Sequence, residues 1–267
     1  MKYTKICAIA LCAGMMLGTV SGCRKRIKPQ VTSVIKTEAT TSKETSDTEA
    51  PQESGSSAAG DQKVNVDSAL QEKANIFVTT FVMQYFQNYD RETATVEQYL
   101  DFAHIYIKIN DHKSLKNETK GELSFETFTF AKAQEVVGKF FGVGLDEVKC
   151  KTLTAPPSSY GDQPAGPYYA DGRIWYEGGA GEGYNNIAIV DSIKNNEDGT
   201  LTLNFTKYTI DYQVYEELDD KGVMKYFKLT PEKAKADKTL EKGPKGTAVV
   251  GVGQSGDYIM ISYKAAR

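Results

Sequence analysis

The spacing of apolar residues changes once along this chain of 267 residues, and the change limits the folds that the chain can adopt. Between residues 67 and 142, apolar side chains recur at intervals of three and four, the pattern of a helix with one buried face. From residue 160 onward they tend to alternate with polar residues, as along strands. Helices followed by antiparallel hairpins predict an α+β fold, with the N-terminal helices packed on one face of a curved antiparallel sheet.

Three helices are predicted in the first part of this region. The first begins at Asp67 or Ser68, either of which can cap it, and runs to about residue 88. The second covers residues 95–109, and the third covers residues 132–142, where a glycine ends it. Residues 122–130, "ELSFETFTF", alternate imperfectly and predict a strand between these two helices.

Hairpins are predicted in the second part, each with a turn that contains glycine. An Asp-Gly pair marks the first turn, and a short helix beginning at Pro231 precedes the last hairpin, because proline favours the first helical position. The predicted hairpins cover residues 167–176, 186–210, 212–229 and 246–263.

The N-terminus carries an export signal. Residues 6–20 are uncharged and would form a helix of about 22 Å, shorter than the ~30 Å hydrocarbon core of a bilayer. The stretch that follows, Val20-Ser21-Gly22-Cys23, resembles the lipobox of bacterial lipoproteins. The resemblance implies that residues 1–22 are a cleaved signal peptide, and that Cys23 receives a diacylglycerol. An ordinary secretory signal with a coincidental cysteine and an uncleaved anchor are the alternatives.

Residues 23–64 are predicted to be a tether. The basic residues Arg24, Lys25, Arg26 and Lys28 would lie at the lipid headgroups, where each charge contributes about 1 kcal/mol. Residues 36–63 contain no Val, Ile, Leu, Met, Cys or aromatic residue, so we expect them to be disordered. About forty flexible residues span roughly 35 Å on average. Tethers of this kind resemble those of Gram-positive surface lipoproteins, which places the single domain, residues 65–267, outside the cell membrane.

Charge and cysteine content narrow the function classes. A formal net charge of −3 gives a mildly acidic chain, which does not favour nucleic-acid binding. Of the four cysteines, Cys7 and Cys12 lie in the leader and Cys23 is the lipidation site, so that only Cys150 stays in the domain. The alternation around it, "VKCKTL", predicts a strand with Cys150 pointing inward. A reactive thiol at Cys150 is the alternative.

The order of the predicted elements resembles the NTF2-like (cystatin-like) fold, in which helices pack against a curved sheet. It also resembles uncharacterised domains of Gram-positive lipoproteins. The similarity covers residues 67–267 and rests on element order, and the helix at Pro231 departs from it. Because one fold supports many functions, this resemblance implies only a fold.

No catalytic motif, cofactor or metal site is predicted. Asp101, His104 and His112 could together hold a metal, but their spacing is not that of a metal motif. The glycine-rich residues 178–186 lead from one strand into another and do not form a phosphate-binding loop. The acidic cluster Glu216, Glu217, Asp219 and Asp220 fits a solvated turn and lacks the spacing of a calcium loop.

Aromatic residues give the candidate binding site. Tyr and Trp offer large rigid faces with one hydrogen-bonding end, which suits sugars and extended peptides. The alternative is that the rings of the hairpin pack on the helices. The candidate ligand-binding residues are Tyr168, Tyr169, Trp175, Tyr176 and Tyr184, with Tyr160 nearby.

Three functions follow as hypotheses. The first is a lipid-anchored module, held on the bilayer through Cys23, that binds a saccharide or peptide of the cell envelope or of a host. The second is an extracytoplasmic hydrolase with a pocket near His104. The third is a structural or assembly partner in an envelope complex.

Overall fold

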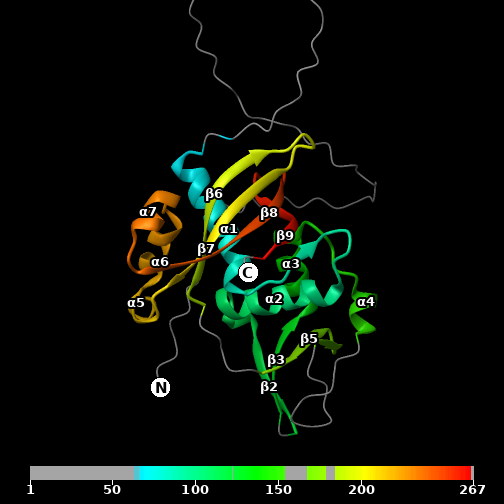
Figure 1. Cartoon of the computed structure of the whole chain (residues 1–267). Coiled ribbons are helices and arrows are strands. Elements are labelled where there is room, and N and C mark those ends of the chain that lie inside the picture. The colour runs from blue at the N-terminus through cyan, green and yellow to red at the C-terminus, as the bar shows by residue number, and fades with distance from the viewer. Residues whose placement is uncertain (1–63, 65, 122, 154–166, 179–183, 266–267) are drawn as a thin grey trace, which may run out of the picture.

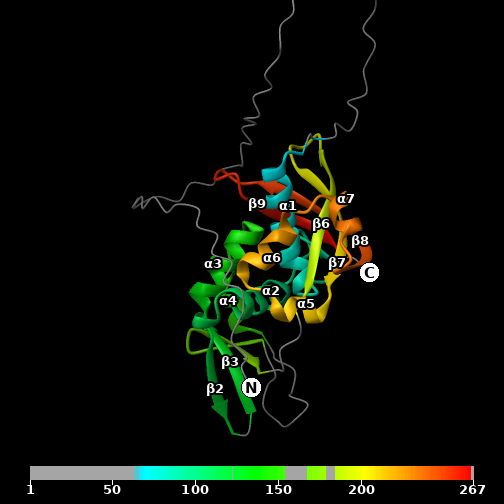
Figure 2. The same cartoon turned by 90° about the vertical axis from the view of Figure 1, so that its left-hand side faces the viewer.

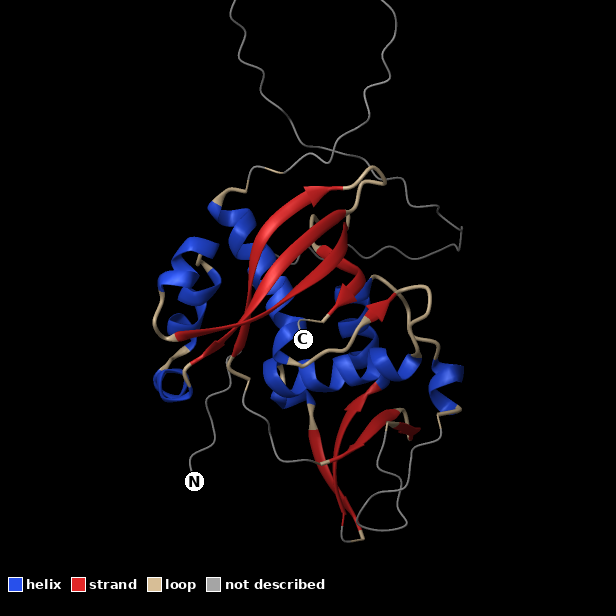
Figure 3. Ribbon diagram, in the orientation of Figure 1, coloured by secondary structure: helices blue, strands red, loops and turns tan. Residues whose placement is uncertain are grey.

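The computed structural model describes residues 64, 66–121, 123–153, 167–178 and 184–265. In this part of the chain the strands form two antiparallel sheets, with helices packed around and between them (Figures 1 and 3). The α+β class predicted from the sequence is confirmed. The prediction of one sheet is wrong, because residues 116–129 and 168–177 pair with one another as a second sheet.

The large sheet has its described strands in the order β1-β9-β8-β7-β6. The predicted hairpin of residues 186–210 is confirmed, and so is the last hairpin. Register shifts in three of the strand pairs mark bulges, which increase the twist of the sheet. Its strands are β1 (Tyr89–Asp90), β6 (Asn186–Asn195), β7 (Leu201–Ile210), β8 (Leu240–Val252) and β9 (Tyr258–Lys264).

The small sheet has the order β2-β3-β5-β4. It lies at the opposite end of the molecule from the turn between β6 and β7 (Figures 1 and 2). The predicted strand at residues 122–130 and the predicted hairpin at residues 167–176 are both part of it. Its strands are β2 (Lys116–Lys120), β3 (Leu123–Thr129), β4 (Tyr168–Ala170) and β5 (Arg173–Glu177).

The helices begin at polar caps that the sequence provides. The Asp67 side chain accepts a hydrogen bond from the Leu70 amide at 2.8 Å, and Thr95 forms a capping box with Gln98. The helices predicted in the first part and the one at Pro231 are confirmed. They are α1 (Ser68–Met83), α2 (Val96–Asn110), η1 (His112–Ser114), α3 (Phe130–Phe141), α4 (Glu147–Lys151), α5 (Tyr212–Glu217), α6 (Asp220–Phe227) and α7 (Pro231–Ala236).

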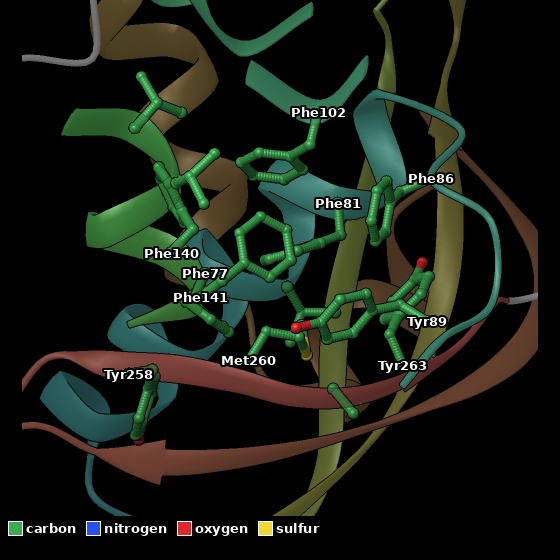
Figure 4. Close-up of a cluster of buried hydrophobic side chains, with 14 of the residues drawn as sticks. Phe77, Phe81, Phe86, Tyr89, Phe102, Phe140, Phe141, Tyr258, Met260 and Tyr263 are labelled. Carbon is green, nitrogen blue, oxygen red and sulfur yellow. The ribbon is translucent and has the colours of Figure 1, made fainter. Parts of the chain in front are cut away.

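An aromatic core joins α1, α2 and α3 to one face of the large sheet (Figure 4). Phe81 lies at its centre, with its ring 4.7 Å from that of Phe102 and 5.8 Å from that of Phe141. Figure 4 also shows Tyr263 of β9 facing these rings from the sheet. A phenylalanine this well buried stabilises the folded state by about 1.5–3 kcal/mol through burial alone.

The opposite face of the large sheet carries a second apolar cluster. Ile187 and Ile189 of β6 and Tyr208 of β7 pack there against Phe227 of α6 and Ala234 of α7. Helices therefore cover both faces of the large sheet. They do so because β6 and β7 carry buried apolar residues on both faces.

Two local predictions are wrong. Residues 212–229 form the helices α5 and α6, because Asp211 and Asp219 accept hydrogen bonds from the first amides of each helix. Residues 147–151 form α4, where Asp146 is the cap. The inward position predicted for Cys150 is confirmed, since its exposed fraction is 0%.

Across the described ranges, no helix is both long and apolar enough to span a bilayer.

Candidate functional site

The predicted aromatic hairpin separates its rings onto the two faces of the small sheet. Asp171 and Gly172 both have positive φ, 52° and 71°, as a two-residue type I′ turn requires. The register pairs Tyr168 with Trp175 on the outer face, and Tyr169 with Ile174 on the face toward the helices. The five candidate residues therefore do not form one surface.

On the inner face, Tyr176 packs on α2. Its ring is stacked on that of His104, with centroids 4.0 Å apart, and its hydroxyl donates to Asp101 Oδ1 at 2.8 Å. Burial and the Asp101 carboxylate raise the pKa of Tyr176 well above its ordinary value, so it stays a hydrogen-bond donor. Tyr169 likewise packs against the core and donates to Glu147 of α4 at 2.5 Å. Tyr169 and Tyr176 therefore pack on the helices, as the alternative to a binding surface expects.

His104 belongs to a buried ion-pair cluster that joins α2 to β3. Its Nε2 donates to Glu126 Oε2 at 2.7 Å, and Lys108 Nζ lies 2.9 Å from Glu126 Oε1. Burial disfavours the Glu126 charge, but the hydrogen bonds from His104 and Lys108 outweigh it and lower the Glu126 pKa. A histidine-carboxylate pair can move a proton, but His104 is only 7% exposed and the Tyr176 ring covers its face.

The structure does not support the metal site considered for Asp101, His104 and His112. The described ranges contain no group of three His, Cys, Asp or Glu side chains placed to hold an ion. The Asp101 carboxylate accepts a hydrogen bond from Tyr176, and His112 lies exposed in η1 beyond the end of α2.

The alternative of a reactive thiol concerns Cys150. Burial, together with the nearby charges of Asp146 and Glu147, raises the pKa of Cys150 to about 11. At neutral pH its sulfur is a thiol, which is a weak nucleophile.

On the outer face, the Trp175 side chain makes its contacts within the protein. Its ring lies 5.8 Å from that of Tyr168 at 15°, and Lys120 Nζ lies 3.7 Å from the indole centroid. The indole N–H donates to the Ala170 carbonyl at 3.2 Å. Because Trp175 is 3% exposed, a ligand could reach it only after Lys120 and Tyr168 had moved.

Other predicted residues lie apart from this hairpin. Tyr184 is partly buried just before β6. Asp219 accepts from the Gly222 amide at 2.7 Å, so this member of the acidic cluster is a helix cap. Cys23, Tyr160 and most of the glycine-rich segment, residues 179–183, lie outside the described residues.

A cavity of about 360 Å³ opens where β6, β7 and β8 meet α5. Sequence reasoning missed it, because its residues come from three distant segments. Tyr212 stands in it with 60% of its surface exposed. We call this cavity the Tyr212 groove; its polar and aromatic lining is Asn185, Thr209, Asp211, Tyr212, Lys238, Thr239 and Glu241.

Hydrogen bonds to backbone carbonyls hold the groove in shape. The Asn185 side chain donates to the Ile210 carbonyl at 2.8 Å, and the Asp211 amide donates to the Thr239 carbonyl at 2.9 Å. Asp211 also caps α5, which fixes where Tyr212 begins the helix. The groove therefore presents one aromatic face, one amide, and charged groups of both signs on a rigid frame.

Comparison with known proteins gives no relative. No family model matches the chain, and neither a curated protein nor a solved structure is similar to it.

Proposed function

We propose that this protein is a lipid-anchored, extracytoplasmic binding module whose ligand is a saccharide of the cell envelope or of a host. The observation that carries the proposal is the Tyr212 groove, where a 60% exposed tyrosine stands beside an amide and charged side chains in about 360 Å³. Ligand pockets typically occupy about 300–1,000 Å³. The groove is thus at the lower end of this range, the size that suits a small polar ligand.

The lining of the groove favours a sugar over a peptide. A sugar ring presents an apolar face to an aromatic ring and hydroxyls to polar side chains, and Tyr212 supplies the ring. An extended peptide bound by strand addition needs a free sheet edge. The groove lies at the ends of β6, β7 and β8 instead.

The position of the groove fits a tethered protein. The Val64 amide donates to the Ile193 carbonyl at 3.1 Å, so the described chain begins beside the far end of β6. Asn185 precedes Ile193 by eight residues, or about 26 Å along a strand. A tether on the N-terminal side of Val64 would thus join the domain at the end of the large sheet opposite the groove, so that its attachment leaves the groove uncovered.

The proposal includes an NTF2-like fold for residues 67–267, on the basis of helices packed against a twisted antiparallel sheet. The small sheet and the helices α5 to α7 would be additions to that fold.

The hydrolase is the second candidate, because His104 lies within hydrogen-bond distance of a carboxylate. The Tyr212 groove, however, is not lined by this pair. A hydrolase centred on His104 would lose turnover of envelope substrates in His104→Gln, and the binding module would keep its affinity in that variant. The assembly-partner function would appear as a stable complex in crosslinked cells and no saccharide binding.

Calorimetric titration tests the binding function. The full chain in detergent micelles is titrated with chitotetraose and with a muramic acid-containing tetrasaccharide from peptidoglycan. We expect saturable binding that weakens at least about tenfold in Tyr212→Ala, since burial of an aromatic side chain contributes about 1.5–3 kcal/mol.

Tyr168→Ala is the matched control, because it removes a tyrosine from the aromatic hairpin instead. If Tyr168→Ala weakens binding and Tyr212→Ala does not, the site is the hairpin surface of Trp175. If both variants bind as the natural chain does, the Tyr212 groove is not the binding site and the function proposed for it is wrong. If neither saccharide binds the natural chain, the saccharide proposal is wrong.

A further inference from the structure

A second cavity, of about 130 Å³, lies beside the C-terminal end of α1. Its side chains come from the end of α1, from β7 and from the end of β9. Lys207 is the one charged side chain among the described residues that line it. We call it the Tyr85 cavity; its lining includes Val82, Tyr85, Phe86, Gln87, Lys207 and Tyr263.

The backbone turns sharply to put Tyr85 there. Tyr85 has φ 50°, a value that non-glycine residues adopt at a cost, and its amide donates to the Val82 carbonyl. The turn sends Phe86 into the aromatic core, 9% exposed, and leaves Tyr85 45% exposed. The Lys207 ammonium lies 5.3 Å from the Tyr85 ring centroid. An exposed aromatic ring and a cation therefore share the mouth of this cavity.

The sheet register relates the two cavities. Lys207 pairs with Ala188, and Thr209 of the Tyr212 groove pairs with Asn186. Residues two apart on a strand point to the same face and lie about 7 Å from each other. The Tyr85 cavity and the Tyr212 groove are thus neighbours along one face of β7.

We propose that the Tyr85 cavity is a second subsite of the same binding surface, and that the ligand is an oligosaccharide with an acidic substituent. This inference rests on the proposed saccharide function. One sugar ring lies in the Tyr212 groove, and the chain continues along β7 past Thr209 to the ring of Tyr85. Lys207 there binds a carboxylate or phosphate of the ligand. The requirement for an anion follows from Lys207, whose cation is the only charge on the described lining.

The test compares charged and neutral ligands of equal length on the full chain in detergent micelles. The probes are the muramic acid-containing tetrasaccharide, which carries lactyl carboxylates, the uncharged chitotetraose, and chitobiose. We expect the acidic tetrasaccharide to bind about tenfold tighter than chitotetraose at low salt, because a charged hydrogen bond contributes more than a neutral one. Chitobiose should bind more weakly than chitotetraose, since it has fewer rings with which to contact the two subsites.

Lys207→Met should abolish the preference for the acidic ligand and its salt dependence, because the variant lacks the cation that lies beside the Tyr85 ring. Tyr85→Asn, chosen because asparagine tolerates positive φ, should weaken both tetrasaccharides by a larger factor than it weakens chitobiose. Lys245→Met removes an exposed lysine that does not line either cavity, and it serves as the charge control.

The outcomes separate the two proposals. If Tyr212→Ala lowers affinity while Lys207→Met and Tyr85→Asn leave the preferences unchanged, the second subsite is wrong and the Tyr212 groove stands. If Lys245→Met removes the acidic preference as fully as Lys207→Met does, the preference reflects overall charge, and the subsite is again wrong. If Tyr212→Ala has no effect on any probe, the proposed function itself fails.

Discussion

At the scale of single residues, Glu126 shows how a buried charge ties a helix to a sheet. Its carboxylate accepts hydrogen bonds from both His104 and Lys108 of α2, and its pKa is lowered in the folded state. A lowered pKa means that the stabilisation is fully present above the unfolded value of about 4.3. It is lost as the pH falls through the folded pKa.

We therefore predict that Glu126→Gln lowers the free energy of unfolding by about 1–3 kcal/mol at pH 7, because it leaves buried partners without their charged acceptor. The difference from the natural chain should shrink as the pH falls below the unfolded value, and it should disappear below the folded pKa, where Glu126 of the natural chain is also neutral. Urea unfolding at a series of pH values measures this. The control is Glu135→Gln, since Glu135 pairs with Lys132 but its side chain is 66% exposed. A constant difference across the series would contradict the assignment.

Trp175 gives a second prediction at this scale, because it is the only tryptophan in the chain. Its 3% exposure predicts slow quenching of its fluorescence by acrylamide. Lys120→Ala uncovers the indole and should raise the quenching rate several-fold. Lys116→Ala, a change on the exposed part of the same strand, should not. Quenching of the natural chain as fast as that of free tryptophan would show that the aromatic hairpin is open, as a binding site there requires.

The sequence could predict single residues only where a local rule decides. The sequence predicts two of the observed helix caps, Asp67 and Gly142. The cap Thr95 is the first residue of the helix predicted over residues 95–109. The Tyr212 groove could not be predicted, because Asn185, Tyr212 and Glu241 meet only after the strands have paired. The Glu126 partners were hidden for the same reason, since His104 and Glu126 are 22 residues apart.

At the scale of elements, α1 protects an edge of the large sheet. Polar side chains on one face of the helix bond the unpaired backbone of β6: Asn75 accepts from the Val190 amide at 2.8 Å, and Gln71 donates to the Val190 carbonyl at 2.9 Å. Thr79 accepts from the Ala188 amide at 2.9 Å. Their spacing of four residues keeps them on one face, and an edge bonded in this way cannot pair with another chain.

This arrangement predicts that Thr79→Val lowers the free energy of unfolding by about 1–3 kcal/mol, because the buried Ala188 amide loses its acceptor. Hydrogen exchange at Ala188 should accelerate in the variant. Thr80→Val is the matched control: the Thr80 hydroxyl donates to the Ile76 carbonyl within α1, so its loss leaves β6 intact. Equal effects from the two substitutions would show that the edge contact does not contribute.

The wrong prediction for residues 212–229 has a physical explanation at the element scale. The segment contains an acidic pair followed by a lysine and a glycine, a sequence that can turn a hairpin or begin a helix. Asp219 is used as a cap, and Val223, Tyr226 and Phe227 then fall on one helical face that packs against the large sheet. Packing of these residues against the large sheet favours the helix over the hairpin. This tertiary contact cannot be predicted from the local sequence pattern.

At the scale of the whole molecule, one end of the large sheet would join the predicted tether, and the other end would bind the ligand. The chain enters beside Ile193, and the Tyr212 groove lies at the other ends of the same strands. The groove would therefore lie about 26 Å along β6 from the point where the predicted tether joins the domain. This separation has a function only if the N-terminus is anchored.

The anchor gives the last prediction. If Cys23 is the lipidated residue, Cys23→Ser cannot receive a diacylglycerol, and the protein should move from the membrane fraction to the soluble extracytoplasmic fraction. Two acyl chains anchor a protein stably, whereas basic residues alone give only salt-sensitive binding. Fractionation of cells that express each form, with a 1 M salt wash, measures this. Cys12→Ser is the matched control, because it lies within the predicted leader and should leave the protein on the membrane. The intact mass of the natural chain decides the alternative: a mass that still includes residues 1–22 would show that residues 6–20 act as an uncleaved anchor.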